Sequence, residues 1–185
     1  MAADASGGHD RGMSEPPDLR VRRASPADAA AVVAIYNEGI GHREATFETE
    51  MRRPRDVIGR LASSSYPALV AEHGGEVVGW AWIAPYSERA AYAGVADCSV
   101  YVRAAARGRG VGTRLIRDLA AAAEQHGFHK LVGKLFTTNQ ASLHLVRRCD
   151  FREVGVHRAH GRLDGHWRDV LVVELLLGDA AGQPM

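Results

Sequence analysis

Asp97-Cys-Ser-Val-Tyr-Val102 and Arg107-Gly-Arg-Gly-Val-Gly112 are the two stretches that decide the fold. They predict a strand followed by a glycine-rich turn, and an amphipathic helix is expected next, from Thr113 to His126. Glycine adopts positive φ and lets the backbone approach a ligand closely, so successive N–H groups and the helix dipole can converge on a phosphate. We therefore expect an anion cradle, to which Arg107 and Arg109 add positive charge.

Two better-known phosphate motifs fit this turn poorly. A Walker loop needs Lys-Ser or Lys-Thr after its last glycine, but Thr113-Arg114 follows Gly112. The dinucleotide fingerprint requires Gly or Ala where Thr113 stands. A tight connection made by Gly108 and Gly110 without any ligand is the structural alternative.

Outward from this unit, strands and helices alternate along the chain. Further strands are expected at Leu19–Arg23, Ala68–Glu72, Val77–Ile83, Lys130–Phe136, Val154–His160 and Arg168–Leu177. Further helices are expected at Pro26–Ile40, Pro54–Leu61 and Ser142–Arg148. This order, closing on a hairpin, predicts an α/β (α+β) fold with a mixed sheet covered on both faces.

The composition is that of one globular domain. The chain has 185 residues, of which 46% are hydrophobic and 24% charged. We expect a folded domain at residues 19–178 between an N-terminal tail, 1–18, and a C-terminal tail, 179–185. Lys and Arg number 23 against 22 Asp and Glu, a net charge of +1, which argues against a nucleic-acid partner bound through a broad basic field.

The cysteine content and the hydropathy favour a cytoplasmic protein. Cys98 and Cys149 are the only cysteines and lie far apart, which argues against a disulfide scaffold and a cysteine-based zinc site. The first residues lack the apolar segment of a signal peptide. The sequence also has no run of about 18 apolar residues, so we expect no membrane partner.

Several motifs carry a resemblance to a known family. Arg107-x-x-Gly110-x-Gly112 after an apolar strand is similar to the signature of the GNAT N-acetyltransferases. Further stretches resemble the phosphinothricin N-acetyltransferase family: Ile35-Tyr-Asn-Glu38, Ala45-Thr-Phe-Glu-Thr49, Ser99-Val-Tyr-Val102, Asn139-Gln-Ala-Ser142 and Gly165-His-Trp-Arg-Asp169. Others look closer to arsinothricin N-acetyltransferases: Pro85-Tyr-Ser87, Ala91-Tyr-Ala-Gly94 and Arg162-Leu-Asp-Gly165. The resemblance covers nearly all of residues 19–178.

The resemblance implies the GNAT fold and acetyl-CoA as co-substrate. In that fold the sheet is mostly antiparallel, and one parallel pair, here Asp97–Val102 and Lys130–Phe136, splays around the cofactor. The cofactor-binding residues that it implies are Val100, Tyr101, Val102, Arg107, Gly108, Arg109, Gly110, Val111, Gly112, Thr113, Asn139 and Ser142. For Asn139 and Ser142, helix capping is the structural alternative.

The chemistry requires a base, because an ammonium group must lose a proton before it attacks a thioester. The resemblance places Asp97 where the family has Glu, and the shorter side chain favours a relay through water. A purely structural carboxylate is the alternative. The general acid is unassigned, because Val146 stands where the family has Tyr or His, and His144 is expected on another helix face.

Three residues are candidates for binding the acceptor. Arg89 and Tyr92 precede the strand expected at Asp97–Val102. The planar guanidinium group of an Arg can bind a phosphinate, arsinate or carboxylate through two hydrogen bonds. Phe47 lies in the loop after the first helix. Solvated or core positions are the alternatives for these residues. We expect no metal, because a three-residue spacing puts His157 and His160 on opposite faces of a strand.

The predicted function is acetyl-CoA-dependent N-acetylation of the α-amine of a small amino-acid-like substrate. Phosphinothricin, arsinothricin and methionine sulfoximine or sulfone are the candidate acceptors, with detoxification or resistance as the role. Acetylation of a polyamine or protein N-terminus is one alternative, and a catalytically weak acyl-CoA sensor is another. The resemblance also implies a homodimer.

Overall fold

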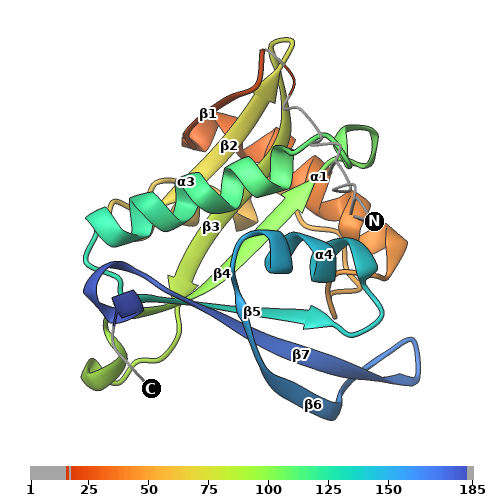
Figure 1. Ribbon diagram of the computed structural model, residues 1–185. Helices are drawn as coiled ribbons and strands as arrows, with labels where there is room; N and C mark the ends of the chain where they lie inside the picture. The colour runs from red at the N-terminus through yellow and green to blue at the C-terminus, as the bar shows by residue number, and fades with distance from the viewer. Residues whose placement is uncertain (1–15, 17, 183–185) are drawn as a thin grey trace, which may run out of the picture.

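A seven-stranded sheet forms the centre of the molecule in the computed structural model, which describes residue 16 and residues 18–182 (Figure 1). The strand order is β1-β2-β3-β4-β5-β7-β6. The strands are β1 (Arg20–Arg23), β2 (Ala68–His73), β3 (Glu76–Pro85), β4 (Val95–Val102), β5 (Lys130–Phe136), β6 (Arg152–Leu163) and β7 (His166–Leu176). The β4–β5 pair is parallel and all the other described pairs are antiparallel. The mixed, mostly antiparallel sheet is therefore confirmed.

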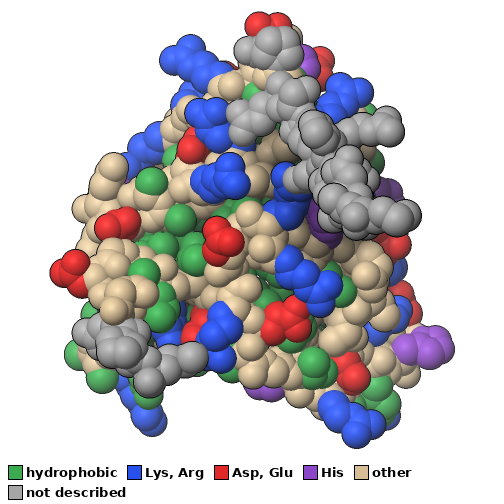
Figure 2. Space-filling view, viewed as in Figure 1, with side chains coloured by type: hydrophobic (Ala, Val, Ile, Leu, Met, Phe, Trp, Pro, Cys, Tyr) green, Lys and Arg blue, Asp and Glu red, His purple; other side chains and the backbone are tan. Residues whose placement is uncertain are grey.

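Helices cover both faces of this sheet, as predicted. The α-helices are α1 (Ala29–His42), α2 (Ile58–Leu61), α3 (Val111–Gln125) and α4 (Gln140–Arg148). In Figure 1, α3 and α4 lie in front of the sheet and α1 lies behind it. Figure 2 shows side chains of both charges interspersed over the face that carries α3 and α4.

A large apolar cluster packs on each face of the sheet. One cluster joins α3 and α4 to the sheet and includes the fully buried Leu115, Leu119 and Leu131. The other joins α1 and α2 to the opposite face around Trp80, which is 1% exposed. Alternation along β3, β4 and β5 therefore sends successive side chains to different layers.

The start of α1 follows the capping signal in the sequence. Pro26–Asp28 forms a 3-10 turn, and Asp28 Oδ2 accepts hydrogen bonds from Ser25 N (2.8 Å) and Ser25 Oγ (3.0 Å). The same carboxylate is paired with Arg22, whose Nη2 lies 2.7 Å from Asp28 Oδ1. Asp28 is thus a buried acid with all its charge compensated, and it fixes α1 against β1.

Some boundaries differ from the prediction. The helix after the glycine turn begins at Val111 rather than Thr113, because Gly110 already occupies the N-cap with φ 78°. The predicted N-terminal tail, 1–18, lies almost wholly outside the described residues. The predicted C-terminal tail, 179–185, begins within a 3-10 helix, Gly178–Gly182, and its last three residues lie outside the described range.

Candidate active site

Strands β4 and β5 pair over a short stretch and then separate. Their parallel register begins with Val95 beside Lys130 and ends with Asp97 beside Val132. Both strands continue past this point, and Figure 1 shows them opening away from each other. The edge of β4 beyond Asp97 is therefore available for main-chain hydrogen bonds to an extended, amide-bearing ligand.

Two cavities meet at this opening. The larger measures about 630 Å³ and is bordered by Tyr36 of α1 and the loop at residues 45–50. The smaller measures about 100 Å³ and is bordered by side chains of α3 and α4. The residues that line both are Ala45, Ser99, Tyr101, Lys134 and Leu135. One ligand can thus enter from the α3 and α4 face and meet a second ligand held on the α1 face.

The glycine turn presents free amides beside the smaller cavity. Gly108 and Gly110 have φ 73° and 78°, which only glycine adopts readily. The first intrahelical bond runs from Arg114 N to Gly110 O, so the amides of Val111, Gly112 and Thr113 have no partner within α3. This is the predicted geometry for holding an anion at a helix N-terminus.

The two predicted contacts on α4 also have structural roles. Asn139 caps the helix, because its Oδ1 accepts the Ser142 amide at 3.0 Å. Its Nδ2 donates to the Glu44 carbonyl at 2.9 Å, which ties the loop after α1 to α4. Asn139 and Ser142 both line the smaller cavity. The capping alternative is therefore observed, and it leaves both residues beside the proposed cofactor path.

Asp97, the predicted base, forms an ion pair at the point where the strands separate. Its Oδ1 and Oδ2 lie 2.9 Å and 3.2 Å from Lys134 Nζ. Asp97 itself lines neither cavity, whereas Lys134 lines both. The carboxylate therefore reaches the junction of the cavities across Lys134 or across a water molecule.

The leaving-group side of the junction is apolar. Val146 is buried in the wall of the smaller cavity, and His144 is exposed on another face of α4, as predicted. Burial raises the pKa of the Cys98 thiol to about 12, so this wall residue stays neutral and is no nucleophile at neutral pH. Burial also raises the pKa of Tyr101, which keeps its hydroxyl protonated. That hydroxyl donates to the Ala45 carbonyl at 3.2 Å.

Of the three predicted acceptor residues, the structure brings one into the larger cavity. Phe47 lines it and packs edge-to-face on Phe136 at 4.7 Å between ring centroids. Arg89 and Tyr92 lie on the exposed 3-10 turn before β4 and line neither cavity.

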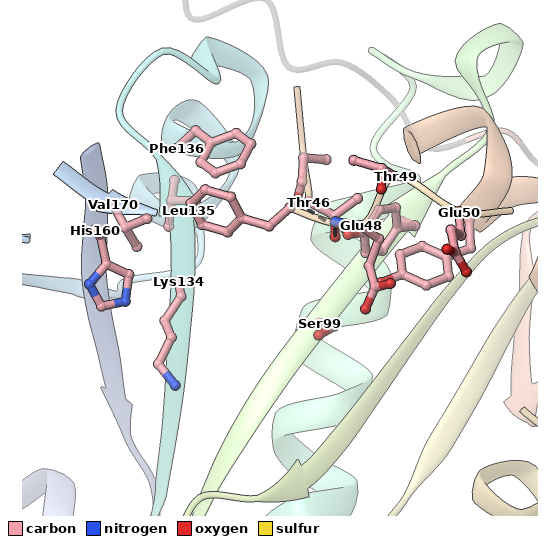
Figure 3. Close-up of a pocket in the computed structure, with 14 residues that line it drawn as sticks. Thr46, Glu48, Thr49, Glu50, Ser99, Lys134, Leu135, Phe136, His160 and Val170 are labelled. Atoms are coloured by element: carbon pink, nitrogen blue, oxygen red, sulfur yellow. Dashed lines mark hydrogen bonds between the residues drawn. The ribbon is translucent and has the colours of Figure 1, made fainter. Parts of the chain in front are cut away.

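The sequence reasoning missed most of the polar lining of the larger cavity. Figure 3 shows Lys134 and His160 on one side, Thr46, Glu48 and Glu50 on the other, and Ser99 between them. Lys134 was findable, since it lies on a strand that the resemblance already placed beside the cofactor. His160 was not, because the expectation of opposite faces for His157 and His160 is wrong. Their ring centroids are 4.9 Å apart.

Comparisons with known proteins agree with this geometry. The sequence profile of the acetyltransferase (GNAT) family matches residues 32–151. The L-methionine sulfoximine/L-methionine sulfone acetyltransferase of Pseudomonas aeruginosa PAO1 is 32% identical over 89% of this chain and 98% of its own. The phosphinothricin N-acetyltransferase of Streptomyces viridochromogenes is 34% identical over 82% of this chain and 84% of its own. A solved phosphinothricin acetyltransferase from Sinorhizobium meliloti, in complex with acetyl-CoA, superposes with a TM-score of 0.83 at 26% identity, covering 90% and 92% of the two chains.

The chain belongs to the acetyltransferase (GNAT) family, and it is an acyltransferase. The prediction of acetyl-CoA as co-substrate agrees with the acetyl-CoA bound in the Sinorhizobium structure. Within residues 18–182, no group of three or more His, Cys, Asp or Glu side chains is placed to hold a metal ion. No described helix is both long and apolar enough to cross a membrane.

Proposed function

We propose that this protein transfers the acetyl group of acetyl-CoA to the α-amine of a small amino-acid-like acceptor. The observation that carries the proposal is the meeting of two cavities at Ser99 and Lys134, on either side of the splayed strands. The smaller cavity has a largely apolar lining that suits a thioester arm. The larger has the volume and polar walls for a small zwitterion.

The cofactor is held by main-chain groups in this proposal. The edge of β4 from Ser99 to Val102 pairs with the pantetheine arm, and the amides of Val111, Gly112 and Thr113 bind the pyrophosphate. Arg107 and Arg109 are exposed beside this turn and add positive charge. Arg107 is oriented by a hydrogen bond from its Nε to the Val102 carbonyl, at 3.2 Å.

The reaction follows from where the groups lie. The amine nitrogen attacks the acetyl carbonyl carbon at the junction, the carbon–sulfur bond breaks, and coenzyme A leaves as a thiolate. Asp97 accepts the ammonium proton through water, because its carboxylate does not line either cavity. As the amide forms, the attacking nitrogen loses its second proton to water and the thiolate takes up a proton from water, so a leaving thiol with a pKa near 8.5 needs no side-chain acid.

The proposed acceptors are phosphinothricin, arsinothricin and methionine sulfoximine or sulfone. The names of the relatives support the first and the last of these classes. Acetylation removes the basicity of the α-amine, which would inactivate toxic amino-acid analogues and is the proposed role in resistance.

Release of free thiol from acetyl-CoA tests the proposed function directly. The wild type is assayed with phosphinothricin, arsinothricin, methionine sulfone, spermidine and a short peptide with a free N-terminus. Turnover with the amino acids alone supports the proposal. Preference for spermidine or the peptide overturns the acceptor class, and acetyl-CoA binding without any thiol release supports a sensor instead.

We also propose that the protein is a cytoplasmic homodimer whose contact includes the C-terminal hairpin, β6 and β7. Four apolar side chains of this hairpin are exposed in the single chain: Val154, Val156, Trp167 and Leu176. Trp167 is 59% exposed, with Arg162 stacked on its ring at 4.3 Å. Burying such side chains against a second copy would stabilise a dimer.

A further inference from the structure

Two side chains that can carry positive charge line the larger cavity, and both lie on the same side of it. They are Lys134 and His160, which Figure 3 shows beside each other on the side of β5 and β6. The acidic lining residues, Glu48 and Glu50, lie on the opposite side. The cavity is therefore polarised, and an anionic group bound in it is drawn to the side of Lys134 and His160.

Lys134 is held where the cavities join. It lies on β5 two residues beyond Val132, the last residue of the parallel ladder, where β5 no longer pairs with β4. Its Nζ is paired with Asp97 and lies 5.6 Å from the centre of the Tyr86 ring. The Lys134 side chain is 47% exposed, and such exposed pairs contribute about 0–1 kcal/mol. Lys134 can therefore turn from Asp97 to another carboxylate at little cost.

A bulge in β6 brings His160 to the cavity. The β6–β7 register jumps between His157 and Gly161, and Ala159 has a positive φ of 48°. The Ala159 amide donates to Asp169 Oδ1 at 2.7 Å, which fixes the bulge from β7. His160 consequently lines the cavity together with Phe136 and Val170, and an imidazole N–H can donate a hydrogen bond in either protonation state.

The arginines near the cavity are either paired with acids or absent from its lining. Glu48 is paired with Arg52 at 2.5 Å, which fixes this carboxylate and occupies this guanidinium. Arg43 is paired with Asp164 at 3.3 Å. Arg89, which the sequence suggested for binding an acidic group, lines neither cavity.

We propose that Lys134 and His160 form an acid-binding wall that selects the acceptor. Lys134 lines both cavities, so it lies near the reacting amine and binds the α-carboxylate, which is two bonds from that nitrogen. His160 lines the larger cavity alone, so it lies farther from the amine and binds an acidic group on the acceptor's side chain. The inference rests on the proposed function, because it takes the acceptor to be an amino acid.

Equilibrium binding tests the role of Lys134 without relying on turnover. Calorimetry with coenzyme A present compares L-methionine sulfone with its α-carboxamide, which lacks the negative charge. Lys134→Met should weaken binding of the acid about tenfold to one hundredfold, as loss of a charge-assisted hydrogen bond predicts, and should leave the carboxamide within about twofold. Lys134→Arg should retain most of the preference for the acid.

A second pair of ligands tests His160. L-Phosphinothricin carries an anionic phosphinate where methionine sulfone carries a neutral sulfone. His160→Gln should lower the preference for phosphinothricin at least fivefold, while binding of methionine sulfone changes little. His126→Gln is the matched control, since this histidine is exposed at the C-terminal end of α3 and lines neither cavity. It should behave as the wild type.

Several results would overturn the acid-binding wall. Equal binding of the acid and the carboxamide by the wild type is one such result, and it needs no variant to fold. Retained preference in Lys134→Met, or its loss in Arg89→Ala, would place the anion site elsewhere. If the protein prefers the acid to the carboxamide but releases no thiol from acetyl-CoA, the proposed function is wrong and the acid-binding wall stands. If it releases thiol but shows no such preference, the proposed function stands and the acid-binding wall is wrong.

Discussion

Asp97 is the residue on which the proposed proton transfer depends. Asp97→Asn keeps the shape of the side chain but removes its basicity, so kcat should fall roughly 100-fold or more while acetyl-CoA binding stays nearly unchanged. Asp97→Glu should retain activity, because the strand end is partly open and the longer side chain reaches farther toward the junction. Steady-state kinetics across pH measures both effects.

The pH–rate profile separates a base from a structural carboxylate. The acidic limb of the wild-type profile should disappear in Asp97→Asn if this carboxylate accepts the proton. Lys134→Met removes the ion pair but leaves the Asp97 carboxylate, so its pH–rate profile should keep an acidic limb. The same acidic limb and similar kcat in the wild type and Asp97→Asn would return Asp97 to a structural role.

At the scale of a single element, α3 offers a matched pair of glycines. Gly110 at its start and Gly127 after its end have φ 78° and 83°. Replacing either with Leu forces a side chain into the left-handed region, at about 1–2 kcal/mol of stability. Gly110→Leu alone should raise the KM for acetyl-CoA tenfold or more, because its side chain blocks close approach to the N-terminal amides.

Thermal unfolding and acetyl-CoA kinetics distinguish the two glycine variants. Similar losses in Tm with a KM effect confined to Gly110→Leu support the pyrophosphate site. An equal KM effect in Gly127→Leu would mean that general destabilisation, rather than the cradle, is being measured.

The first turn before α1 gives a prediction about acid stability. The Arg22 guanidinium and the Ser25 donors hold the pKa of Asp28 at about 2, below its ordinary value of 3.8. Because the folded pKa is depressed, this stabilisation is present above about pH 4 and is lost as the pH falls towards 2. Asp28→Asn should therefore lower the free energy of unfolding by about 1–3 kcal/mol at pH 7.

Urea unfolding at several pH values measures this effect. The difference between the wild type and Asp28→Asn should shrink between pH 4 and pH 2. A difference that stays constant over this range would show that the amide disturbs packing rather than a charged interaction.

At the scale of the whole molecule, the exposed C-terminal hairpin predicts self-association. Light scattering at micromolar concentration should give about twice the mass of the 20.0 kDa chain. Trp167→Ala and Val156→Lys should shift the protein toward the monomer, because each removes exposed apolar area or adds charge. Tyr86→Ala serves as the control, since Tyr86 is also an exposed aromatic residue but lies on the loop before β4.

A monomeric mass for the wild type would contradict the proposed dimer. Dissociation by Tyr86→Ala alone would move the contact to the loop before β4. Activity measured alongside shows whether the larger cavity depends on the second copy.

The sequence by itself determined the family, the order of the elements and the glycine turn before α3. These features are local: glycine φ preferences, capping residues and apolar periodicity act over a few neighbouring residues, and Arg107 to Gly112 are contiguous. The boundary of α3 shifted only because Gly110 could serve as N-cap. Phe47 lines the larger cavity, in the loop that follows α1, and its contact with the acceptor stays a prediction.

Only the tertiary structure decided which side chains line the larger cavity. Lys134 and Asp97 are 37 residues apart in the sequence, and they meet because the pairing of β4 with β5 places Asp97 beside Val132, two residues before Lys134. His160 reaches the cavity through a bulge that Asp169 of another strand fixes, so strand alternation placed it wrongly. Arg89 falls outside the cavity although it is close to Asp97 in sequence. Sequence spacing predicts which face of a regular element a residue occupies, whereas an active site assembled from several strands depends on where their regular pairing stops.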